Sequence, residues 1–391
     1  MIQLKIKWSR INQFSNISEI SKAIIQILQK KSFLMSTGKK YKRVWVDGCF
    51  DVTHFGHYNF IRQASLIGDY VVAGVHDDED IARNKSPPVF TLQERVEMVG
   101  ACKWVNEVVP GSPFTMTDLS WLDRYNCEVA LHGDDITLDA SGKDCYSFMR
   151  DAGRFDTLPR TKSISTTNLI GRMLRLPALE MPENVAPRSL LSTATSISEL
   201  QTYLPTCRRI AQFTSISEPK PDDRIIYVDG TFDLLHPGHI SFLRKAKALG
   251  DYMIVGVHSD EDVASHSMPG MPIMTLQERV LNVLAIKYVD DVVIGAPYII
   301  TKDLLKQINP TLVVSGQAAT SILRSELDSF RVPKEMGIYK TVESDYPDMT
   351  VTSVVHRIMK NYALYAERNS KREKLACEQT NFVHSEATVP K

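Results

Sequence analysis

The stretch VDGCFDVTHFGH, residues 46–57, joins an apolar run to an amphipathic segment and carries two histidines around one glycine. Residues 44–46 predict a buried strand, and residues 56–67 predict a helix, because their apolar positions fall on one helical face. Those positions are Phe60, Ala64 and Ile67. Gly68 stands where a helix-ending glycine is expected. The stretch is therefore the turn between a first strand and a first helix.

The same alternation continues downstream. Residues 92–99 predict a second helix. Further strands are expected at residues 70–76, 105–109 and 127–132. Alternation of this kind predicts an α/β, Rossmann-like, doubly wound parallel sheet with helices on both faces. Ligands of such sheets bind at the carboxyl ends of the strands, and this is where His54 and His57 fall.

The opening stretch occurs twice. Residues 46–82 align without a gap with residues 228–264, and more than half of the aligned positions are identical. TLQERV at residues 91–96 recurs at residues 275–280, after a two-residue insertion. The period is far longer than that of a solenoid repeat, so the sequence predicts two tandem copies of a whole domain.

The duplication divides the chain into five expected parts. They are a basic, disordered N-terminal extension at 1–41, a catalytic domain at 42–176, a linker at 177–222, a second, degenerate domain at 223–367 and a flexible tail at 368–391. Apolar residues near 203–213 indicate that the linker is partly packed. The acid-poor extension also fits an organelle transit peptide, but a single arginine and the lack of a clear cleavage site favour a plain extension.

The bulk composition excludes several classes of protein. The 391 residues carry a formal net charge of zero, which argues against a nucleic-acid binder or a polybasic membrane protein. No apolar run approaches the length of a transmembrane helix. The six cysteines form no C-x-x-C pair, which argues against a disulfide framework and a zinc site. We therefore expect a cytoplasmic protein that binds no nucleic acid.

His54 and His57 lie where a helix begins, and its free N–H groups and positive dipole end favour an anionic phosphate. Gly48 and Gly56 let the backbone approach a ligand closely. Two imidazoles at this place can donate hydrogen bonds to phosphoryl oxygens as charge develops in a transition state. A single histidine near a helix start is usually a polar cap. Two of them around a glycine, repeated in a second domain, favour a phosphate site.

The His-x-Gly-His pattern resembles the nucleotidyltransferase superfamily. DGCFD at 47–51, HFGH at 54–57 and RTKSISTT at 160–167 together resemble the cytidylyltransferase family. That family has a glycine where Ser163 stands, so we expect a somewhat different turn there. Two such domains in one chain resemble the tandem-domain branch of the family, whose acceptor is phosphoethanolamine. The resemblance covers about residues 42–367.

The resemblance implies a catalytic set of four residues in the first domain, His54, His57, Lys85 and Arg160. Lys85 matches the family's catalytic lysine, a mobile charge that follows a triphosphate. Arg160 matches the motif arginine, whose planar fork suits phosphate oxygens. The implied nucleotide contacts are Gly48, Cys49, Phe50, Asp51, His132, Thr166 and Thr167. Thr166 and Thr167 are equally placed to cap the next helix, and His132 to be a polar strand end.

The implied reaction is the in-line displacement of pyrophosphate from CTP by phosphoethanolamine, which gives CDP-ethanolamine for phosphatidylethanolamine synthesis. A phosphate monoester has a second pKa of about 6 and needs no general base at neutral pH. We expect Mg²⁺ to accompany CTP, without a protein metal site, because no acidic cluster marks one. The pathway suits peripheral association with the endoplasmic reticulum. Phosphocholine or glycerol 3-phosphate as the acceptor, an adenylyl donor, and a non-catalytic nucleotide sensor remain open.

The second domain keeps the histidine motif but loses cations. Residues 265–268, which align with Lys85, contain no lysine, and Asp345 aligns with Arg160. Each charged contact is worth about 1.5–3 kcal/mol, so we expect catalysis only in the first domain. The second domain is expected either to bind a cytidine nucleotide or to be purely structural. Its candidate contacts are Thr231, Phe232, His236, His239, Gly316 and Thr350.

Overall fold

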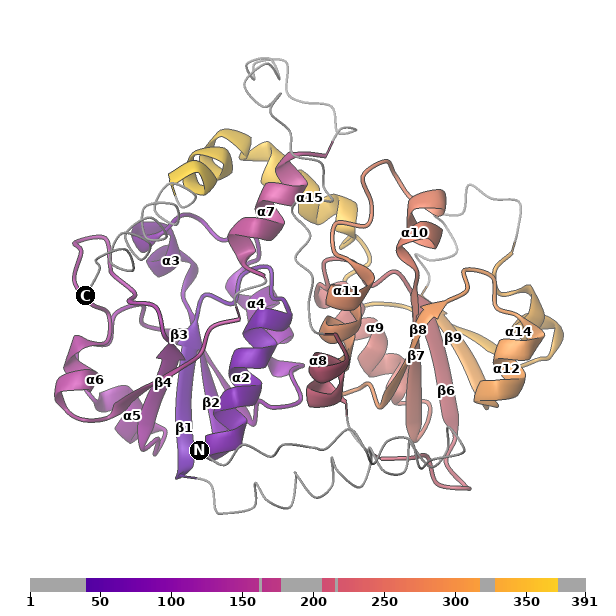
Figure 1. Ribbon diagram of the computed structural model, residues 1–391, viewed down its shortest axis with the longest axis horizontal. Helices are drawn as coiled ribbons and strands as arrows, with labels where there is room; N and C mark the ends of the chain where they lie inside the picture. The colour runs from indigo at the N-terminus through magenta and orange to yellow at the C-terminus, as the bar shows by residue number, and fades with distance from the viewer. Residues whose placement is uncertain (1–39, 162–163, 177–205, 215–216, 317–327, 372–391) are drawn as a thin grey trace, which may run out of the picture.

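The computed structural model describes residues 40–161, 164–176, 206–214, 217–316 and 328–371. Within them it confirms the α/β fold class, because each domain contains a five-stranded parallel sheet flanked by helices (Figure 1). The basic extension, much of the linker and the end of the chain lie outside the described residues.

The first domain is built on five parallel strands. They are β1 (Tyr41–Gly48), β2 (Gly68–His76), β3 (Glu107–Ser112), β4 (Val129–Gly133) and β5 (Phe155–Leu158). The helices are α2 (Phe55–Ile67), α3 (Asp78–Asn84), α4 (Leu92–Gly100), α5 (Ser120–Arg124), α6 (Ser147–Asp151) and α7 (Thr166–Leu174). The sheet order is β3-β2-β1-β4-β5. The winding direction reverses between β1 and β4, which is where doubly wound sheets bind their ligands.

The central strand β1 is apolar on both faces because helices cover both sides of the sheet. Val44, Trp45 and Val46 are all fully buried. Val44 and Val46 join one hydrophobic core, and Trp45 joins the core on the opposite face. This alternation follows from the two-residue period of a strand.

Gly68 is needed for strand packing and not, as the sequence suggested, to end a helix. It does not end α2 in a left-handed conformation, because its φ is −119° and β2 begins at this residue. A Cβ atom at Gly68 would lie 2.6 Å from the Val44 side chain. The glycine therefore permits the close approach of β2 to β1 and does not supply a positive φ.

The second domain repeats this architecture. Its strands are β6 (Ile225–Gly230), β7 (Tyr252–His258), β8 (Asp291–Ala296), β9 (Leu312–Gly316) and β10 (Tyr339–Val342). The helices are α9 (Pro237–Lys247), α10 (Asp260–His266), α11 (Leu276–Leu284), α12 (Lys302–Ile308), α14 (Arg331–Glu335) and α15 (Val351–Lys360). The order β10-β9-β6-β7-β8 is the first domain's order in corresponding strands.

The two domains face each other across an approximate twofold axis. Helix α4 packs on α9, and its counterpart α11 packs on α2, so each pair repeats the other. The Lys103 N–H donates to the Ala285 carbonyl, and the Lys287 N–H donates to the Ala101 carbonyl, both at 2.9 Å. Buried side chains from both domains form one continuous hydrophobic core.

The described part of the linker contains α8 (Thr206–Phe213), which packs against α11. Phe213 is fully buried, and the centroid of its ring lies 5.0 Å from that of the Trp104 ring.

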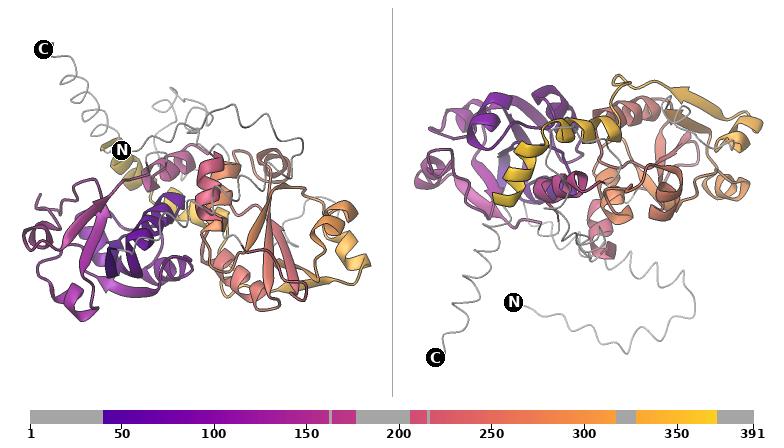
Figure 2. Two further views of the ribbon diagram at one scale, coloured as in Figure 1. Left: turned by 60° about the horizontal axis from the view of Figure 1, so that its bottom comes forward. Right: turned by 90° about the horizontal axis from the view of Figure 1, so that it is seen from above.

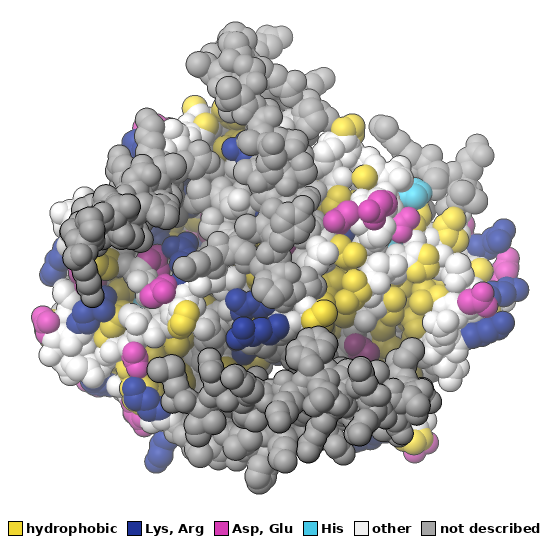
Figure 3. Space-filling view, viewed as in Figure 1, with side chains coloured by type: hydrophobic (Ala, Val, Ile, Leu, Met, Phe, Trp, Pro, Cys, Tyr) yellow, Lys and Arg dark blue, Asp and Glu magenta, His cyan; other side chains and the backbone are white. Residues whose placement is uncertain are grey.

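Lys and Arg side chains form a group near the middle of the face shown in Figure 3. Burial lowers the pKa of Arg62, and the charges of Arg209 and Arg208 on α8 lower it further.

The chain continues as a helix beyond the end of α15, over residues 362–371. This segment, yellow in Figures 1 and 2, extends from the second domain over the first. Tyr365 is 2% exposed and Asn369 is 5% exposed, so the segment is packed. The expectation of a flexible tail from residue 368 is therefore wrong for residues 368–371. Residues 372–391 lie outside the described residues.

Candidate active site

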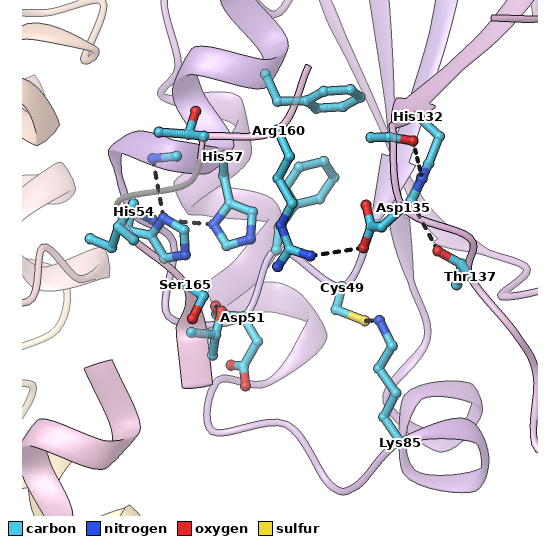
Figure 4. A pocket seen from close by; sticks show the side chains of 18 of the residues that line it. Cys49, Asp51, His54, His57, Lys85, His132, Asp135, Thr137, Arg160 and Ser165 are labelled. Carbon is cyan, nitrogen blue, oxygen red and sulfur yellow. Dashed lines mark hydrogen bonds and ion pairs between the residues drawn. The ribbon is translucent and has the colours of Figure 1, made fainter. Parts of the chain in front are cut away.

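A cavity of about 200 Å³ opens at the carboxyl ends of β1 and β4, and Figure 4 looks into it. Ten of the residues predicted for the first site line it: Gly48, Cys49, Phe50, Asp51, His54, His57, Lys85, His132, Arg160 and Thr166. Thr167 is not among the lining residues. Other lining residues were not among the predicted site residues. Of these, Asp47 and Ser165 lie within the quoted motifs, whereas Asp135 and Arg368 lie outside them.

His54 and His57 lie one above the other at the start of α2. Their ring centroids are 4.0 Å apart, and the ring planes are inclined by 28°. The Gly56 N–H donates to His54 Nδ1 at 3.1 Å, and the His54 N–H donates to His57 Nδ1 at 3.3 Å. The predicted cap and the predicted phosphate site are thus the same pair of side chains. The backbone contacts orient both rings before any ligand arrives.

These contacts also fix where the two rings carry their protons. An imidazole whose Nδ1 accepts a hydrogen bond carries its proton on Nε2 when it is neutral. Burial lowers the pKa of His57 to about 3, aided by the positive charges of Arg160 and Lys85. Burial and then the charge of His57 hold the pKa of His54 well below its usual range. Both rings are therefore neutral Nε2–H donors, and His54 Nε2 is buried without a hydrogen-bond partner among the described residues.

The loop before the histidines is strained. Phe50 and Val52 have φ values of +47° and +45°, in the left-handed region that a β-branched residue rarely adopts. Phe232 and Leu234 repeat these values in the second domain, at +49° and +42°. Such strain persists only where the surroundings hold the backbone firmly, and it concentrates at functional sites.

Arg95, on α4, is the group that holds this loop. It is fully buried. Its acceptors are the carbonyl oxygens of Cys49, His76 and Phe90 at 2.7, 2.7 and 3.1 Å and the Asp78 carboxylate at 2.5 Å. Arg279 makes the matching contacts in the second domain. The recurrence of TLQERV was the sequence signal for this residue, although the pattern alone does not show what the arginine contacts.

Lys85 follows α3 at the rim of the cavity. Its Nζ lies 3.7 Å from Cys49 Sγ and 5.1 Å from the centroid of the Phe114 ring. Within the described part of the chain, no carboxylate forms an ion pair with it. An anionic ligand therefore has no described carboxylate to displace from the Lys85 ammonium group.

Arg160 reaches the cavity from the segment after β5. Its Nη1 forms an ion pair with Asp135 Oδ2 at 2.8 Å, and both side chains are about half exposed. The backbone N–H of Arg160 donates to Asp134 Oδ1 at 3.1 Å. A phosphate ligand of Arg160 thus has to compete with Asp135 in this conformation.

The Asp51 carboxylate, in the lining of the cavity, accepts hydrogen bonds from the loop before α4. The N–H groups of Val89 and Phe90 donate to its oxygens at 3.0 Å. Burial raises the pKa of Asp51, while these N–H groups and the charge of Arg368 act in the opposite direction. In this conformation its acceptors serve the loop before α4.

Ser165 caps α7, not Thr166 or Thr167 as the alternative interpretation of those residues had it. Its side chain accepts a hydrogen bond from the Asn168 N–H at 3.1 Å. The Thr166 hydroxyl instead donates to the Asp51 carbonyl at 3.1 Å. The late motif is thereby tied to the loop that precedes the histidines.

Asp47 is a buried acid in the lining of the cavity, 4% exposed. Trp45 Nε1 donates to one of its oxygens at 3.1 Å, and the Tyr146 hydroxyl donates to the other at 2.6 Å. His132 also lines the cavity, with its ring centroid 4.7 Å from that of Tyr146. The lining of the cavity therefore includes a buried carboxylate as well as the cationic side chains of Lys85 and Arg160.

The second domain has the same histidine pair in a different electrostatic setting. The ring centroids of His236 and His239 are 3.8 Å apart, and burial lowers the pKa of His239 to about 4. Asp345, in the place of Arg160, accepts hydrogen bonds from Ser241 and from two cations, Arg244 and Lys245. These cations are consequently neutralised by a protein carboxylate.

The other candidate residues of the second domain contact neighbouring parts of their own domain. Thr350 caps α15 through a hydrogen bond from the Ser353 N–H at 3.1 Å. Gly316 ends β9, and residues 317–327, which follow it, lie outside the described residues. Thr231 accepts from Arg279 through its carbonyl at 2.7 Å, and Phe232 packs 5.5 Å from His239. Nucleotide binding at these residues stays a prediction.

A group of metal ligands and a membrane-spanning helix are both absent from the described residues. No three His, Cys, Asp or Glu side chains in the described ranges are grouped so that they could hold a metal ion. None of the helices found there is long and apolar enough to cross a membrane.

The chain is similar to known proteins over both domains. The cytidylyltransferase-like family matches residues 45–172 and residues 227–367, one match in each domain. An ethanolamine-phosphate cytidylyltransferase from Dictyostelium discoideum is 45% identical, over 89% of this chain and 98% of that protein. One from Mus musculus is 41% identical, over 85% of this chain and 89% of that protein.

A choline-phosphate cytidylyltransferase A from Mus musculus is less similar. It is 32% identical over 160 residues, which are 40% of this chain and 43% of that protein. The ethanolamine-phosphate relatives thus match both repeats in extent, whereas this one matches about the length of one repeat. Since both repeats carry the family's match, the chain belongs to the cytidylyltransferase-like family of nucleotidyltransferases.

Proposed function

We propose that the first domain transfers the cytidylyl group of CTP to phosphoethanolamine and releases pyrophosphate and CDP-ethanolamine. The observation that carries the proposal is the pair of neutral Nε2–H donors at the start of α2, beside the cations Lys85 and Arg160. The extent of the match to the ethanolamine-phosphate relatives supports the choice of substrates.

The histidines act as hydrogen-bond donors in this proposal, not as bases. An imidazole with a pKa of about 3 is a poor base near pH 7. None is needed, because the acceptor phosphate is already largely dianionic there. His54 and His57 donate from Nε2 to phosphoryl oxygens as charge shifts toward the leaving pyrophosphate. Lys85 and Arg160 compensate the negative charge of the triphosphate, and the rigid loop held by Arg95 positions the donors.

Mg²⁺ enters the proposal as part of the substrate, bound to the phosphates of CTP. The described residues offer no three-ligand group for a resident metal, and a triphosphate supplies oxygen ligands of the kind that Mg²⁺ prefers. The cations of the cavity then share with the metal the task of neutralising the phosphates.

Asp47 supports an acceptor that carries a positive charge. A buried carboxylate in an otherwise phosphate-binding cavity suits a zwitterion, with its phosphate near the histidines and its ammonium near Asp47. Glycerol 3-phosphate has no cation to offer this acid. Phosphocholine has a cation but no N–H group to donate. The primary ammonium of phosphoethanolamine satisfies both conditions.

The second domain does not catalyse in this account, because Asp345 occupies the place of Arg160. The location that suits the reaction is the cytoplasm, with peripheral contact at the endoplasmic reticulum. The free thiols of the described cysteines are in keeping with a reducing compartment.

The direct test offers the purified chain CTP or ATP with Mg²⁺ and one of three acceptors, and identifies the products by mass spectrometry. We expect CDP-ethanolamine from CTP and phosphoethanolamine. Faster turnover of phosphocholine or glycerol 3-phosphate would overturn the acceptor, and faster turnover of ATP would overturn the donor. CTP binding without any product would replace the transferase with a nucleotide sensor.

A further inference from the structure

The helical segment at residues 362–371 leaves the second domain and is fastened to the first domain at two points. The Tyr365 hydroxyl donates to the Pro87 carbonyl at 3.2 Å, just after Lys85. The Asn369 side-chain amide donates to the Thr167 carbonyl at 3.0 Å, in the first turn of α7. The segment is therefore held between two parts of the first domain that border the cavity.

Arg368 lies between these anchors and lines the cavity itself. An adjoining cavity shares Lys85, Ser86 and Arg368 with it and extends along the helical segment. The side chain of Arg368 thus stands on the same side of the site as Lys85. None of the motifs of the first domain includes it, since it comes from the far end of the chain.

The guanidinium of Arg368 lacks the partners that other arginines here have. Its Nε is buried with no hydrogen-bond partner, and among the described residues no carboxylate forms an ion pair with it. Arg160 has Asp135 at 2.8 Å, and the neighbouring Lys371 has Glu367 at 2.7 Å. The charge of Arg368 acts on the Asp51 carboxylate without forming an ion pair with it. The N–H groups of a partly buried guanidinium need acceptors, so an Nε without one beside a phosphate cavity points to an anionic ligand.

We propose that Arg368 binds the β- and γ-phosphates of CTP, so that the helical segment that follows the second repeat contributes a side chain to the site in the first domain. The proposal rests on the function given above. The planar fork of a guanidinium suits two phosphate oxygens at once. The β- and γ-phosphates are assigned because they carry most of the charge of CTP and because Arg368 lies beside Lys85. The second domain then has a role in the reaction although its own site lacks two cations.

The test measures binding by calorimetry in the full chain, for CTP with Mg²⁺, for pyrophosphate and for CMP, without acceptor. Arg368→Ala should weaken CTP and pyrophosphate binding by about 10- to 100-fold, the range for a lost charged contact. CMP binding should stay within about twofold of wild type, because CMP lacks the phosphates in question. Arg368→Lys should keep part of the affinity for CTP.

Lys360→Ala is the matched control, because it removes an exposed cation from the last residue of α15 and should leave all three affinities unchanged. Equal weakening of CTP and CMP binding, or unchanged CTP binding, in Arg368→Ala would overturn the proposal. Arg368→Gln tests the charge with a side chain of similar polarity if the alanine variant does not fold, and it should show the same selective loss. Absence of CTP binding in the wild type would instead contradict the proposed function.

Discussion

Arg172, in the last turn of α7, and Glu278, in α11, form a buried ion pair across the domain interface. Two parallel contacts join them, Nη1 to Oε2 at 2.6 Å and Nη2 to Oε1 at 2.9 Å, and the side chains are 1% and 2% exposed. Arg357 and Glu94 repeat the pair at 2.7 and 2.8 Å, with 38% and 11% of their side chains exposed. The same ion pair therefore occurs twice, related by the approximate twofold axis, and the Arg172–Glu278 pair is the more deeply buried of the two.

Arg172→Ala should destabilise the protein far more than Arg357→Ala. Removing one partner of a buried ion pair leaves an uncompensated charge and costs about 3–5 kcal/mol. Arg357 is partly exposed, so water offsets part of the loss in the second pair, which should cost about 1–2 kcal/mol. Urea denaturation followed by tryptophan fluorescence measures both free energies of unfolding. Equal losses for the two variants would show that burial does not decide the strength of this contact.

Arg95→Lys and Arg279→Lys should separate stability from catalysis. Both arginines hold a strained loop through the same set of backbone acceptors, and a lysine cannot reach several acceptors in the same way. We expect similar losses of free energy of unfolding, of about 1–3 kcal/mol each. Only Arg95→Lys should also lower kcat, by 10-fold or more, because its loop carries the working histidines. A matching loss of kcat in Arg279→Lys would contradict this assignment.

Asp229→Asn should stabilise the protein above neutral pH. Burial raises the pKa of Asp229 to about 7, and one of its oxygens has no hydrogen-bond partner among the described residues. The folded state then keeps a proton that the unfolded state loses above its ordinary pKa of about 4. The contribution of this group to the free energy of unfolding therefore falls as the pH rises from about 4 to 7. Denaturation at several pH values should show a smaller decline in the variant, and an identical pH dependence would refute the assignment.

Asp47→Asn should raise the KM for phosphoethanolamine by 10-fold or more and leave CTP affinity nearly unchanged. The carboxylate is assigned to the ammonium of the acceptor, and a charged hydrogen bond of this kind is worth about 1.5–3 kcal/mol. Tyr146→Phe removes a hydrogen-bond donor to Asp47 but keeps its charge, so this control should change the KM much less. Steady-state kinetics with each substrate varied in turn distinguishes the two effects. A loss of CTP affinity without a change in the acceptor KM would assign Asp47 to the nucleotide.

Much of the site follows from local sequence. The turn at residues 46–57 lies between a strand and a helix that periodicity predicts, and the alternation of elements implies a sheet whose carboxyl edge gathers the motif residues. His54, His57, Lys85 and Arg160 all line the cavity as expected. Their placement in the cavity was predictable because it depends on neighbours within one strand-helix unit or on the common edge of the sheet.

The remaining features depend on tertiary contacts that no local pattern encodes. Arg368 reaches the cavity only because a helix from the second repeat crosses over the first. Asp51 turns toward Val89 and Phe90 because the loop before α4 returns to it. Gly68 is needed because a neighbouring strand brings Val44 close. None of these three contacts could be predicted from motif spacing, because the contacting residues are far apart in the sequence.

The most direct test of the central claim is pyrophosphate release from CTP and phosphoethanolamine with Mg²⁺, measured for wild type, His57→Ala and His239→Ala. The two variants remove the same side chain from equivalent places in the two domains. We predict that His57→Ala lowers kcat by about 10²- to 10³-fold, as expected for the loss of one donor to a developing charge. His239→Ala should retain most of the wild-type rate. Equal loss in both variants, or full activity in His57→Ala, would contradict a single working site in the first domain.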